Sequence, residues 1–423
     1  MEFVTNIPVD EYENFVSQHP LKSHFMQSYY FGELKSKFAG QVHHVGLKEA
    51  GKLVATALLL EMKLPLTYTY LYSPRGYVID FNDVGLLTAF TAELKRFAKT
   101  RKAIFIRINP DIKLHQIDEA ANKIAAGSDN YAIVETLLNL AYTRKPLYRN
   151  FELAEPRFTF RLDLTQPLEE IKAKMHQTLR NIINRENIFD VEIAKTTADE
   201  IVDFYRLMQD TEQRDGFTAF SLAYYQEFYQ TLHDQQMSDL YLAKVKKSKI
   251  KETFNLEITK NKALQAELSA TGKNKGRIKD LNDQLNKLLK QQAEFNKRAE
   301  KLPETICLSG MITTKYHDKT WNVHGGNNDV LRDLNANYLM YYKIIEDYKA
   351  EGYKILDLFG TTGNPVKENS LYGLHQFKRR FGAEYIEFIG EFDLVLNPPL
   401  YFIYDRCLPF YRKVLKLIRK IKK

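Results

Sequence analysis

One stretch of this chain repeats apolar residues at alternating spacings of three and four, which is the seam of a helix that packs along another helix. The seam consists of Ile278, Leu281, Leu285, Leu288, Gln292, Phe295, Ala299 and Leu302. A weaker seam upstream consists of Ile250, Phe254, Leu264 and Leu268. The segment SATGKNKG between the two seams supplies two glycines for a reversal of the chain. The pattern therefore predicts an antiparallel coiled-coil arm over residues 249–302, which Pro303 ends.

Two helices of roughly 20–25 residues, at about 1.5 Å of rise per residue, give this arm a length of some 30–40 Å. Its basic faces are compatible with RNA contact, although an ordinary solvated helix face is the simpler explanation. The arm needs a scaffold to carry it, so the flanking segments decide the fold class.

Strand and helix patterns alternate on both sides of the arm. HHVGLKEAGKLVATALLLEM predicts two strands around a turn, LTYTYLYS and AIFIRI predict further strands, and VGLLTAFTAELKRFAKTRK predicts a helix between them. The order restarts near Phe158 with FTFRLDL, a single helix over PLEEIKAKMHQTLRNIINRE, and later the hairpin ICLSGMITTKYHDKTWNVHGG. The chain is therefore predicted to be α/β (α+β), with one domain at 1–155 and a second built from 156–248 and 303–395.

The charge of the chain indicates the class of its partners, and its cysteine content indicates the compartment. The formal net charge of +8 and the pI near 9.0 favour nucleic acid, phosphorylated substrates or an acidic membrane face, with general basicity as the alternative. Only Cys307 and Cys407 occur, which suits a reducing compartment. The first residues lack the apolar region of a signal peptide, and no apolar run reaches the ~18 residues of a membrane span. These features predict a cytoplasmic protein.

The last segment, 396–423, ends in a basic amphipathic tail. Seven cations lie within FYRKVLKLIRKIKK, and Val414, Leu415, Ile418 and Ile421 fall on one helical face. Such a pattern is typical of a helix that lies on an anionic membrane surface. An ordinary basic terminus remains the alternative.

The sequence motifs of several enzyme classes are absent. The chain has no GxxxxGK[ST] phosphate loop, no HExxH pair and no GxSxG elbow. His43 and His44 are adjacent on a predicted strand, where their side chains face opposite ways and cannot share a metal. Domains of this composition are similar to the acyl-CoA N-acyltransferase (GNAT) fold, but neither QRDGFT nor RRFGAE completes the [QR]xxGx[GA] loop that binds coenzyme A. We expect no cofactor and no metal.

Four sequence motifs, the arm and the basic tail then follow one another in the chain. SHFMQSYYFGELK, YLYSPRGYVID and INPDI precede the arm, and YGLHQFKRRFGAEYIEFIGEFD lies between the arm and the tail. In this order the chain resembles the FemABX-type aminoacyltransferases, which build peptidoglycan cross-bridges in Gram-positive bacteria. The resemblance covers essentially the whole chain and implies two GNAT-like domains.

The resemblance implies a reaction and its partners. Members of that family move an amino acid from aminoacyl-tRNA, the co-substrate, to the side-chain amine of the peptidoglycan stem peptide. The acceptor is lipid II or UDP-MurNAc-pentapeptide, and other bridge-forming transferases are possible partners. Peripheral contact with the anionic inner membrane surface would fit a lipid-linked acceptor. The alternatives are transfer to another amine, such as a protein N-terminus, and a non-catalytic RNA-binding scaffold.

The resemblance also assigns substrate-binding residues. Lys35 occupies the position of a cation for the acceptor's diphosphate, and Phe38 that of an aromatic residue beside the substrate. Arg214 matches a second phosphate-binding cation, Asp111 a contact to the acceptor, and His324 a position where many relatives have Tyr. Four of them have a structural alternative: a helix end for Lys35, core packing for Phe38, a packed or solvent-facing side chain for His324, and a turn cap for Asp111.

The catalytic assignment rests on HQFKRRFG, which we expect in a strand-like, aromatic context. Lys378 matches the family's Phe-Lys pair, whose lysine faces the reacting carbonyl, and Phe377 would fix the backbone there. A cation at this place stabilises the oxyanion that forms when an amine attacks an ester. Arg379 and Arg380 are left for tRNA phosphates or solvent, and no side chain stands out as a general base.

Overall fold

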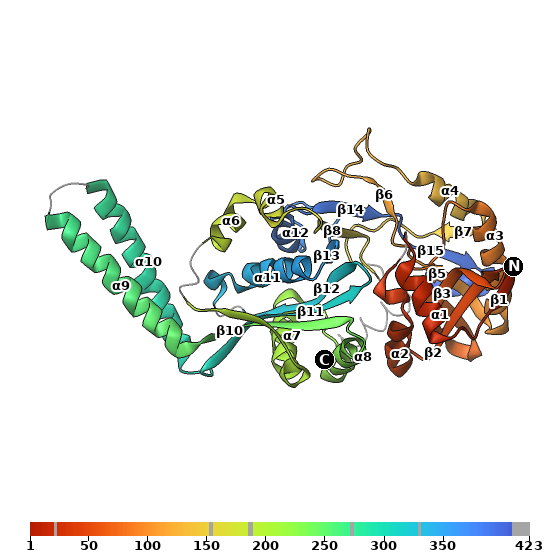
Figure 1. The fold of residues 1–423 in the computed structure, drawn as a ribbon, viewed down its shortest axis with the longest axis horizontal. Coiled ribbons are helices and arrows are strands. Elements are labelled where there is room, and N and C mark those ends of the chain that lie inside the picture. The colour runs from red at the N-terminus through yellow and green to blue at the C-terminus, as the bar shows by residue number, and fades with distance from the viewer. Residues whose placement is uncertain (21–22, 152–154, 185–188, 271–274, 329–330, 408–423) are drawn as a thin grey trace.

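The computed structural model describes residues 1–20, 23–151, 155–184, 189–270, 275–328 and 331–407. Figure 1 shows two sheets side by side and a pair of long helices that projects from the end of the second sheet. The basic tail Phe410–Lys423 lies outside the described residues. No helix among the described residues is both long enough and apolar enough to cross a membrane.

The first sheet has seven strands in the order β1-β2-β3-β4-β5-β15-β7. Their bounds are β1 (Glu2–Val4), β2 (Gln41–Glu49), β3 (Lys52–Lys63), β4 (Thr69–Ser73), β5 (Ala103–Ile108), β15 (Phe392–Val395) and β7 (Tyr142–Arg144). Its helices are α1 (Val9–Gln18), α2 (Tyr29–Ala39), α3 (Val84–Thr100) and α4 (Tyr131–Asn139), and α13 (Pro398–Phe402) follows β15. The pair β4–β5 is parallel, and every other named pair in this sheet is antiparallel.

The second sheet has eight strands in the order β6-β14-β8-β13-β12-β11-β10-β9. Their bounds are β6 (Lys113–Gln116), β14 (Glu384–Phe388), β8 (Phe158–Asp163), β13 (Ile355–Thr361), β12 (Lys319–Asn327), β11 (Thr305–Tyr316), β10 (Ser238–Lys246) and β9 (Glu192–Thr196). Its helices are α5 (Leu168–Lys174), α6 (Gln177–Ile183), α7 (Ile201–Asp215), α8 (Leu222–His233), α11 (Ala336–Ala350) and α12 (Tyr372–Arg379). Here β12–β13 is the parallel pair.

The sheets exchange strands. The chain passes from β7 in the first sheet to β8 in the second, where β8 pairs with both β13 and β14. Strand β15 follows β14 in the chain but returns to the first sheet, where it pairs with both β5 and β7. Strand β6 likewise leaves the first half to pair with β14. Sheet membership thus differs from the predicted domain ranges at β6 and β15.

One hydrophobic core joins the two halves. Phe25 and Leu58 from the first half pack with Phe204, Tyr225 and Trp321 from the second in a single buried cluster. Both sequence halves therefore supply one core, which excludes water from the contact between them.

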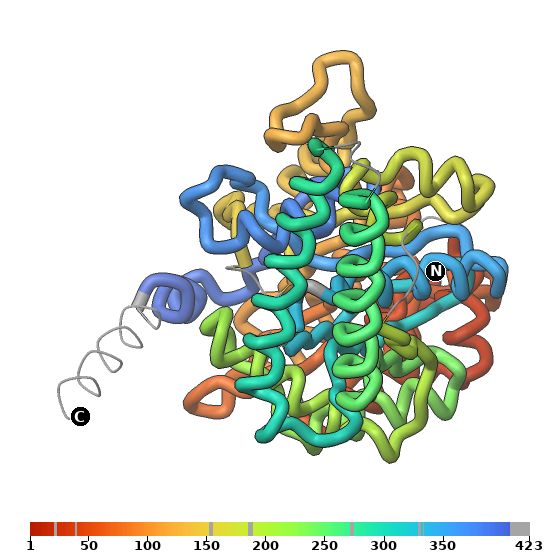
Figure 2. The backbone as a smooth tube through the Cα atoms, turned by 90° about the vertical axis from the view of Figure 1, so that its left-hand side faces the viewer, coloured from red at the N-terminus to blue at the C-terminus, as the bar shows by residue number. Residues whose placement is uncertain are grey.

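The two expected arm helices are α9 (Lys247–Ala270) and α10 (Lys275–Ala299). Helix α9 continues directly from β10, and α10 leads back to β11, the strand that pairs with β10. Figure 2 shows the two helices side by side along their length. Phe254 and Phe295 are buried at the base, with ring centroids 6.1 Å apart. Supercoiling of this pair stays a prediction.

Two local predictions were wrong. The single helix expected over 167–186 is instead two helices, α5 and α6, because the chain is extended at Met175 and His176. The backbone N–H of His176 donates to the Arg380 carbonyl at 2.8 Å, a tertiary bond that the helical pattern does not reveal. The strand-like context expected for Lys378 is also wrong, because Lys378 lies on helix α12.

Candidate active site

Lys378 lies on the buried face of a short amphipathic helix. His375 and Lys378 lie on the buried side of helix α12, and Lys378 is only 5% exposed. Its neighbour Phe377 packs against Tyr338, Tyr341 and Phe381, with ring centroids 4.6–5.5 Å away. The aromatic packing fixes the helix, and the helix in turn fixes the lysine.

Two backbone carbonyls hold the Lys378 ammonium. Nζ donates to Gly360 O at 2.7 Å and to Phe359 O at 3.0 Å, both at the end of β13. Burial lowers the pKa of Lys378 to about 7, and the nearby Asp357 carboxylate only partly opposes that shift. The result is a buried cation that can lose its proton near neutral pH.

The carbonyl pair is itself held by a carboxylate. Phe359 has a positive φ of 64°, a left-handed conformation that bulky residues rarely adopt. Its backbone N–H donates to Asp357 Oδ1 at 2.7 Å, and this bond supports the turn. A Cβ added at Gly360 would overlap the Pro156 ring, so only glycine fits beside that proline. Asp357 therefore determines where the two carbonyls point.

Asp111 belongs to the same buried network. Arg161 donates from Nε to Asp357 Oδ2 at 2.7 Å and from Nη2 to Asp111 Oδ1 at 2.6 Å. Burial would raise the pKa of Asp111, but Arg161 outweighs it and holds that pKa well below its usual range. Asp111 follows the end of β5 as predicted, yet it is 9% exposed and engaged by an arginine rather than open to solvent.

A second cluster surrounds Lys35, which α2 carries. Lys35 Nζ donates to Tyr224 Oη of α8 at 3.0 Å and lies 5.0 Å from the centre of the Phe31 ring. Burial lowers the pKa of Lys35, and Glu155 opposes the shift. Phe38 is 47% exposed, with its ring centroid 5.2 Å from that of Tyr224. An ammonium and the rings of Phe31, Phe38 and Tyr224 thus meet where the two halves adjoin.

His324 of β12 faces the same cluster from the second sheet. Its ring lies among Phe220, Tyr225 and Phe228, and Nε2 has no hydrogen-bond partner among the described residues. Burial, together with the nearby charge of Lys35, lowers the pKa of His324 to about 3. The imidazole is therefore neutral near pH 7.

Arg214 lies in the last turn of α7. Its Nη1 donates to Asn327 Oδ1 at 2.7 Å, and its Nε pairs with Asp215 at 2.7 Å. Asn327 ends the strand that carries His324, which connects Arg214 to the Lys35 cluster through β12.

The structure thus gathers Lys35, Phe38 and His324 around Tyr224, and Lys378 and Asp111 around the Asp357–Arg161 pair. Sequence reasoning missed Tyr224, Arg161 and Asp357. Tyr224 stands in SLAYYQEFYQTL, where aromatic residues at helical spacing indicate core. The other predicted cations are engaged: Arg379 pairs with Glu119, and Arg380 donates to Tyr338.

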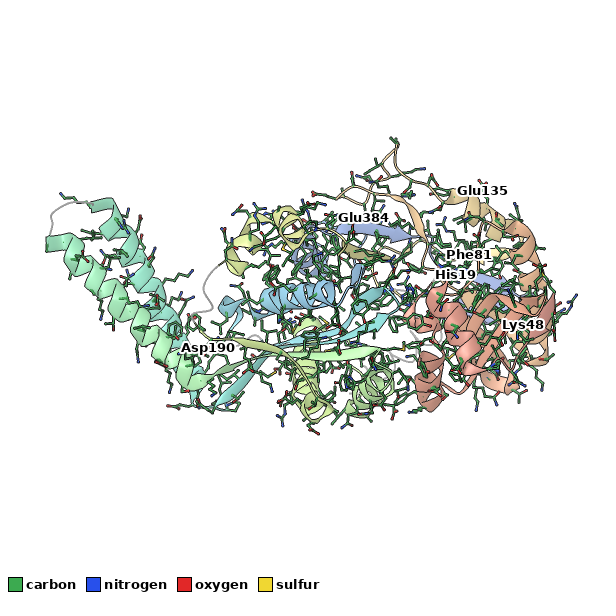
Figure 3. The ribbon with its side chains drawn as sticks, viewed as in Figure 1. His19, Lys48, Phe81, Glu135, Asp190 and Glu384 are labelled. Atoms are coloured by element: carbon green, nitrogen blue, oxygen red, sulfur yellow. The ribbon has the colours of Figure 1, made fainter. Side chains whose placement is uncertain are left out.

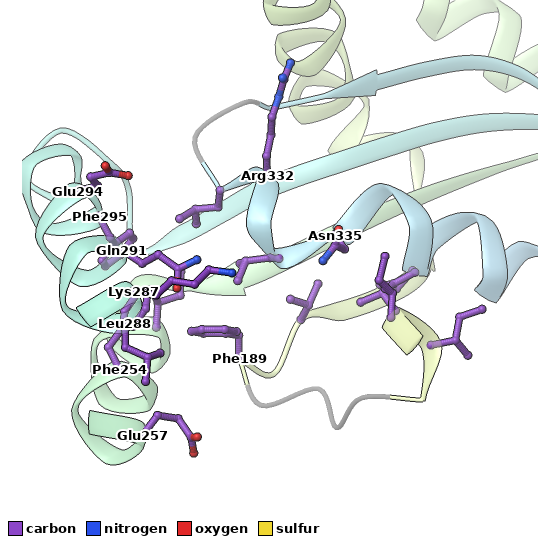
Figure 4. A pocket seen from close by; sticks show the side chains of 18 of the residues that line it. Phe189, Phe254, Glu257, Lys287, Leu288, Gln291, Glu294, Phe295, Arg332 and Asn335 are labelled. Atoms are coloured by element: carbon purple, nitrogen blue, oxygen red, sulfur yellow. The ribbon is translucent and has the colours of Figure 1, made fainter. Parts of the chain in front are cut away.

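Two other features lie away from these clusters. A cavity of about 980 Å³ lies between the arm and the body, where Phe189, Phe254, Leu288 and Phe295 line it (Figure 4). None of the predicted site residues lines it. Within the described part of the chain, His, Cys, Asp and Glu form no group of three or more suited to a metal ion.

Comparisons with known proteins bear on the whole chain. The model of the FemAB family matches residues 7–407. The lipid II:glycine glycyltransferases of Staphylococcus haemolyticus (strain JCSC1435) and Staphylococcus saprophyticus subsp. saprophyticus are each 28% identical to this chain. Each alignment covers 99% of this chain and 99% of the relative.

Solved structures agree on the fold. The crystal structure of FemX superposes with a TM-score of 0.74 at 24% identity, covering 95% of this chain and 99% of that one. A tandem GNAT protein from the clavulanic acid biosynthesis pathway has a TM-score of 0.50 at 10% identity, covering 93% and 98%. The predicted α/β class with two GNAT-like halves is confirmed by the two sheets and these likenesses.

Proposed function

The chain belongs to the FemAB family, and on that premise we propose that it is an aminoacyltransferase that builds the peptidoglycan interpeptide bridge. It moves an amino acid from aminoacyl-tRNA to the side-chain amine of the stem peptide. The names of the relatives make lipid II the first acceptor to test, with UDP-MurNAc-pentapeptide as its soluble counterpart, and glycine the first donor. The ester of the charged tRNA supplies the energy, so the reaction needs no further cofactor.

The buried cation at Lys378 is the observation that carries this proposal. An ammonium has three hydrogens, and the bonds to Phe359 O and Gly360 O use two of them. The third is free for the oxyanion that forms when the acceptor amine attacks the ester carbon. Because the lysine is fixed and shielded from water, its charge stabilises the transition state more than it would in solvent.

The Lys35 cluster is the proposed site for the acceptor's diphosphate. An ammonium meets phosphate oxygens as a point charge, and the Tyr224 hydroxyl adds a hydrogen-bond donor beside it. Phe38 and His324 supply apolar walls, and Arg214 supplies a second cation further along β12. Asp111 acts through Arg161 in this proposal, because its carboxylate is engaged in the buried network.

Membrane contact belongs to the basic tail in this proposal, since a lipid-linked acceptor is presented at an anionic surface. Each Lys or Arg near such a surface contributes about 1 kcal/mol of attraction. Co-sedimentation with anionic and with neutral vesicles tests the contact, and deletion of 410–423 should abolish binding to the anionic ones. Equal binding to both vesicle types would remove the tail from membrane docking. Other bridge-forming transferases are the proposed protein partners.

The deciding experiment incubates the enzyme with a mixture of charged tRNAs and either lipid II or UDP-MurNAc-pentapeptide. Mass spectrometry then identifies the added residue and the amine that received it. A product on the stem-peptide side chain supports the proposal. Product only on a peptide N-terminus would redirect it to the other acceptor class, and tRNA binding without product would indicate a scaffold.

A further inference from the structure

Two exposed phenylalanine rings pack on the ring of Tyr224, whose hydroxyl accepts a hydrogen bond from Lys35 at 3.0 Å. The ring of Phe220 stacks on Tyr224 with centroids 4.2 Å apart, and the Phe38 centroid lies 5.2 Å from that of Tyr224. Phe38 is 47% exposed and Phe220 is 50% exposed. Apolar surface therefore begins directly beside the ammonium that binds the acceptor's diphosphate in the proposed function.

Phe220 is held in place at the surface by its neighbours. Its backbone N–H donates to the Tyr225 hydroxyl at 3.3 Å, and its ring meets the His324 ring edge-on, with centroids 5.8 Å apart. These contacts leave half of the side chain open to solvent. An exposed ring that is already fixed loses little conformational entropy when an apolar group binds to it.

Each of the two proposed phosphate-binding cations is followed three residues later by an exposed phenylalanine. Lys35 and Phe38 lie on α2, where residues three apart share one side of the helix. Arg214 lies in the last turn of α7, and Phe217 in the segment that leads to α8 is 41% exposed. Large exposed apolar groups next to polar ones are typical of a site for an apolar ligand.

The charges around these rings favour an apolar occupant over a nucleic acid. Proteins that stack bases on aromatic rings also line the path of the phosphates with cations. Here Lys37, the next cation along α2, pairs with Glu227 of α8 and donates to Thr231. Its charge is therefore balanced within the protein, and the surface beside Phe38 continues without a cation from Lys37 for a second phosphate.

We propose that Phe38, Phe217 and Phe220 bind the first isoprene units of a polyprenyl diphosphate, an inference that rests on the proposed function. In a lipid-linked acceptor a single oxygen joins the polyprenyl chain to the diphosphate. When Lys35 binds that diphosphate, the first carbons of the chain must lie on the adjoining surface, which these rings form. The site thereby favours a lipid-linked acceptor over a nucleotide-linked one, and the α2–α8 face turns toward the membrane that holds the rest of the chain.

Calorimetry with soluble probes tests the site without the transfer reaction. The wild type should bind farnesyl diphosphate, below its micelle concentration, at least about tenfold more tightly than inorganic pyrophosphate, because several CH₂ groups leave water. The double variant Phe38→Ser/Phe220→Ser should reduce that preference to about twofold or less. Phe38→Leu/Phe220→Leu keeps apolar side chains and should retain most of the preference, a rescue that a change in folding would not produce.

Steady-state kinetics then compare the two acceptors. In the double serine variant the KM for lipid II should rise about tenfold relative to the KM for UDP-MurNAc-pentapeptide, because only lipid II carries the polyprenyl chain. Leu138→Ser is the matched control, since Leu138 is 46% exposed on α4, which lies far from α2 and α8 (Figure 1). The control should leave the ratio of the two KM values unchanged.

Three results would overturn the assignment. One is a wild type that binds farnesyl diphosphate and pyrophosphate equally well. Another is tighter binding of UDP than of farnesyl diphosphate, which would assign the rings to a nucleoside base. The third is a double serine variant that keeps the farnesyl preference but loses binding to vesicles without lipid II, because the rings would then contact the bilayer itself. A wild type that prefers farnesyl diphosphate yet transfers to no amine acceptor would defeat only the proposed function, so the two failures are distinguishable.

Discussion

The two sheets repeat one arrangement and differ in what they carry. In the first, the parallel pair β4–β5 is followed in space by β15 and β7, and in the second the parallel pair β12–β13 is followed by β8 and β14. Strands β15 and β8 fill equivalent places, but only β15 comes from outside the sequence range of the half that it completes. The scaffold is therefore duplicated, and the sheets are locked together by exchange.

A buried Arg–Asp pair joins the strand in this place, β15 or β8, to its neighbour in both sheets, with the charges reversed. In the first sheet Arg107 of β5 binds Asp393 of β15 through two bonds of 2.8 Å. In the second, Arg161 of β8 binds Asp357 of β13 at 2.7 Å. The two pairs occupy corresponding registers, so each acts as a clamp between two neighbouring strands.

The two halves differ in one helix, which precedes β7 in the first half and β14 in the second. Helix α4 of the first half carries one charged residue, Glu135 (Figure 3), whereas α12 of the second half carries Lys378. Asp357 also has a task that its counterpart Asp393 lacks, because it holds the Phe359 turn on which Lys378 rests. The frame is present twice, and the proposed catalytic cation lies in one copy.

Breaking the two clamps should show the largest effects. Arg161→Met and Arg107→Met each remove the arginine partner of buried carboxylates, and each should lower the free energy of unfolding by about 3–5 kcal/mol. Only Arg161→Met should also lower kcat of the folded enzyme, because Asp357 loses the partner that orients it. Urea unfolding and initial rates measure the two effects. Equal kcat losses in both variants would contradict the division of tasks.

Removing the cation tests where the chemistry lies. Lys378→Met should lower kcat by about 10²–10³ with little change in stability or acceptor affinity, since one oxyanion partner is lost. Lys247→Met is a matched control, because Lys247 also holds two backbone carbonyls, those of Ala299 and Leu302, at the base of the arm. A Lys378→Met enzyme with more than half of the wild-type turnover would remove this residue from the mechanism.

The Lys35 cluster joins both halves, so its loss should affect binding rather than chemistry. Lys35→Ala should raise the KM of a diphosphate-bearing acceptor about tenfold or more, since hydrogen bonds to charged groups contribute about 1.5–3 kcal/mol. Arg214→Ala should act in the same direction. A truncated acceptor without the diphosphate should respond to neither change. If both variants discriminate against it as the wild type does, the phosphate site is misplaced.

The lowered pKa of Lys378 predicts how kcat depends on pH. The protonated lysine is the working form, so kcat should fall above pH 7, about tenfold per unit, as the ammonium deprotonates. Lys378→Arg should move that limb to higher pH, because a guanidinium stays protonated. Intact aminoacyl-tRNA must be verified at each pH. A kcat that stays flat from pH 7 to 9 would place the pKa of Lys378 elsewhere.

Much of the fold followed from local patterns. The turn at Glu49–Gly51, the buried strand before Pro110 and the two arm helices are where periodicity and turn residues predicted them. The assignment of strands to sheets did not follow, because FTFRLDL indicates a strand but not its neighbours. Pairing of Arg161 with Asp357 joins residues that no sequence spacing connects.

The candidate site was predicted only in part, for similar reasons. Lys378 was named through the family resemblance, but its helix was missed although Leu374, Phe377 and Phe381 have helical spacing. The hydrogen-bond partners of Lys378 are backbone carbonyl groups. Every residue has such a group, so the sequence does not reveal which ones are used. Asp111 was placed correctly after a strand, and its burial depends on Arg161, which lies on a strand from the other half.

The exchange of strands also governs how the protein can be made. On the ribosome, β5 and β7 emerge long before β15, which fills the gap between them. At about 5–20 residues per second, that gap stays open for tens of seconds. During this interval the nascent first half exposes two unpaired strand edges, a template for wrong pairing. A chaperone that shields strand edges during translation would act on this half, and the native enzyme would emerge only once the late strand is delivered.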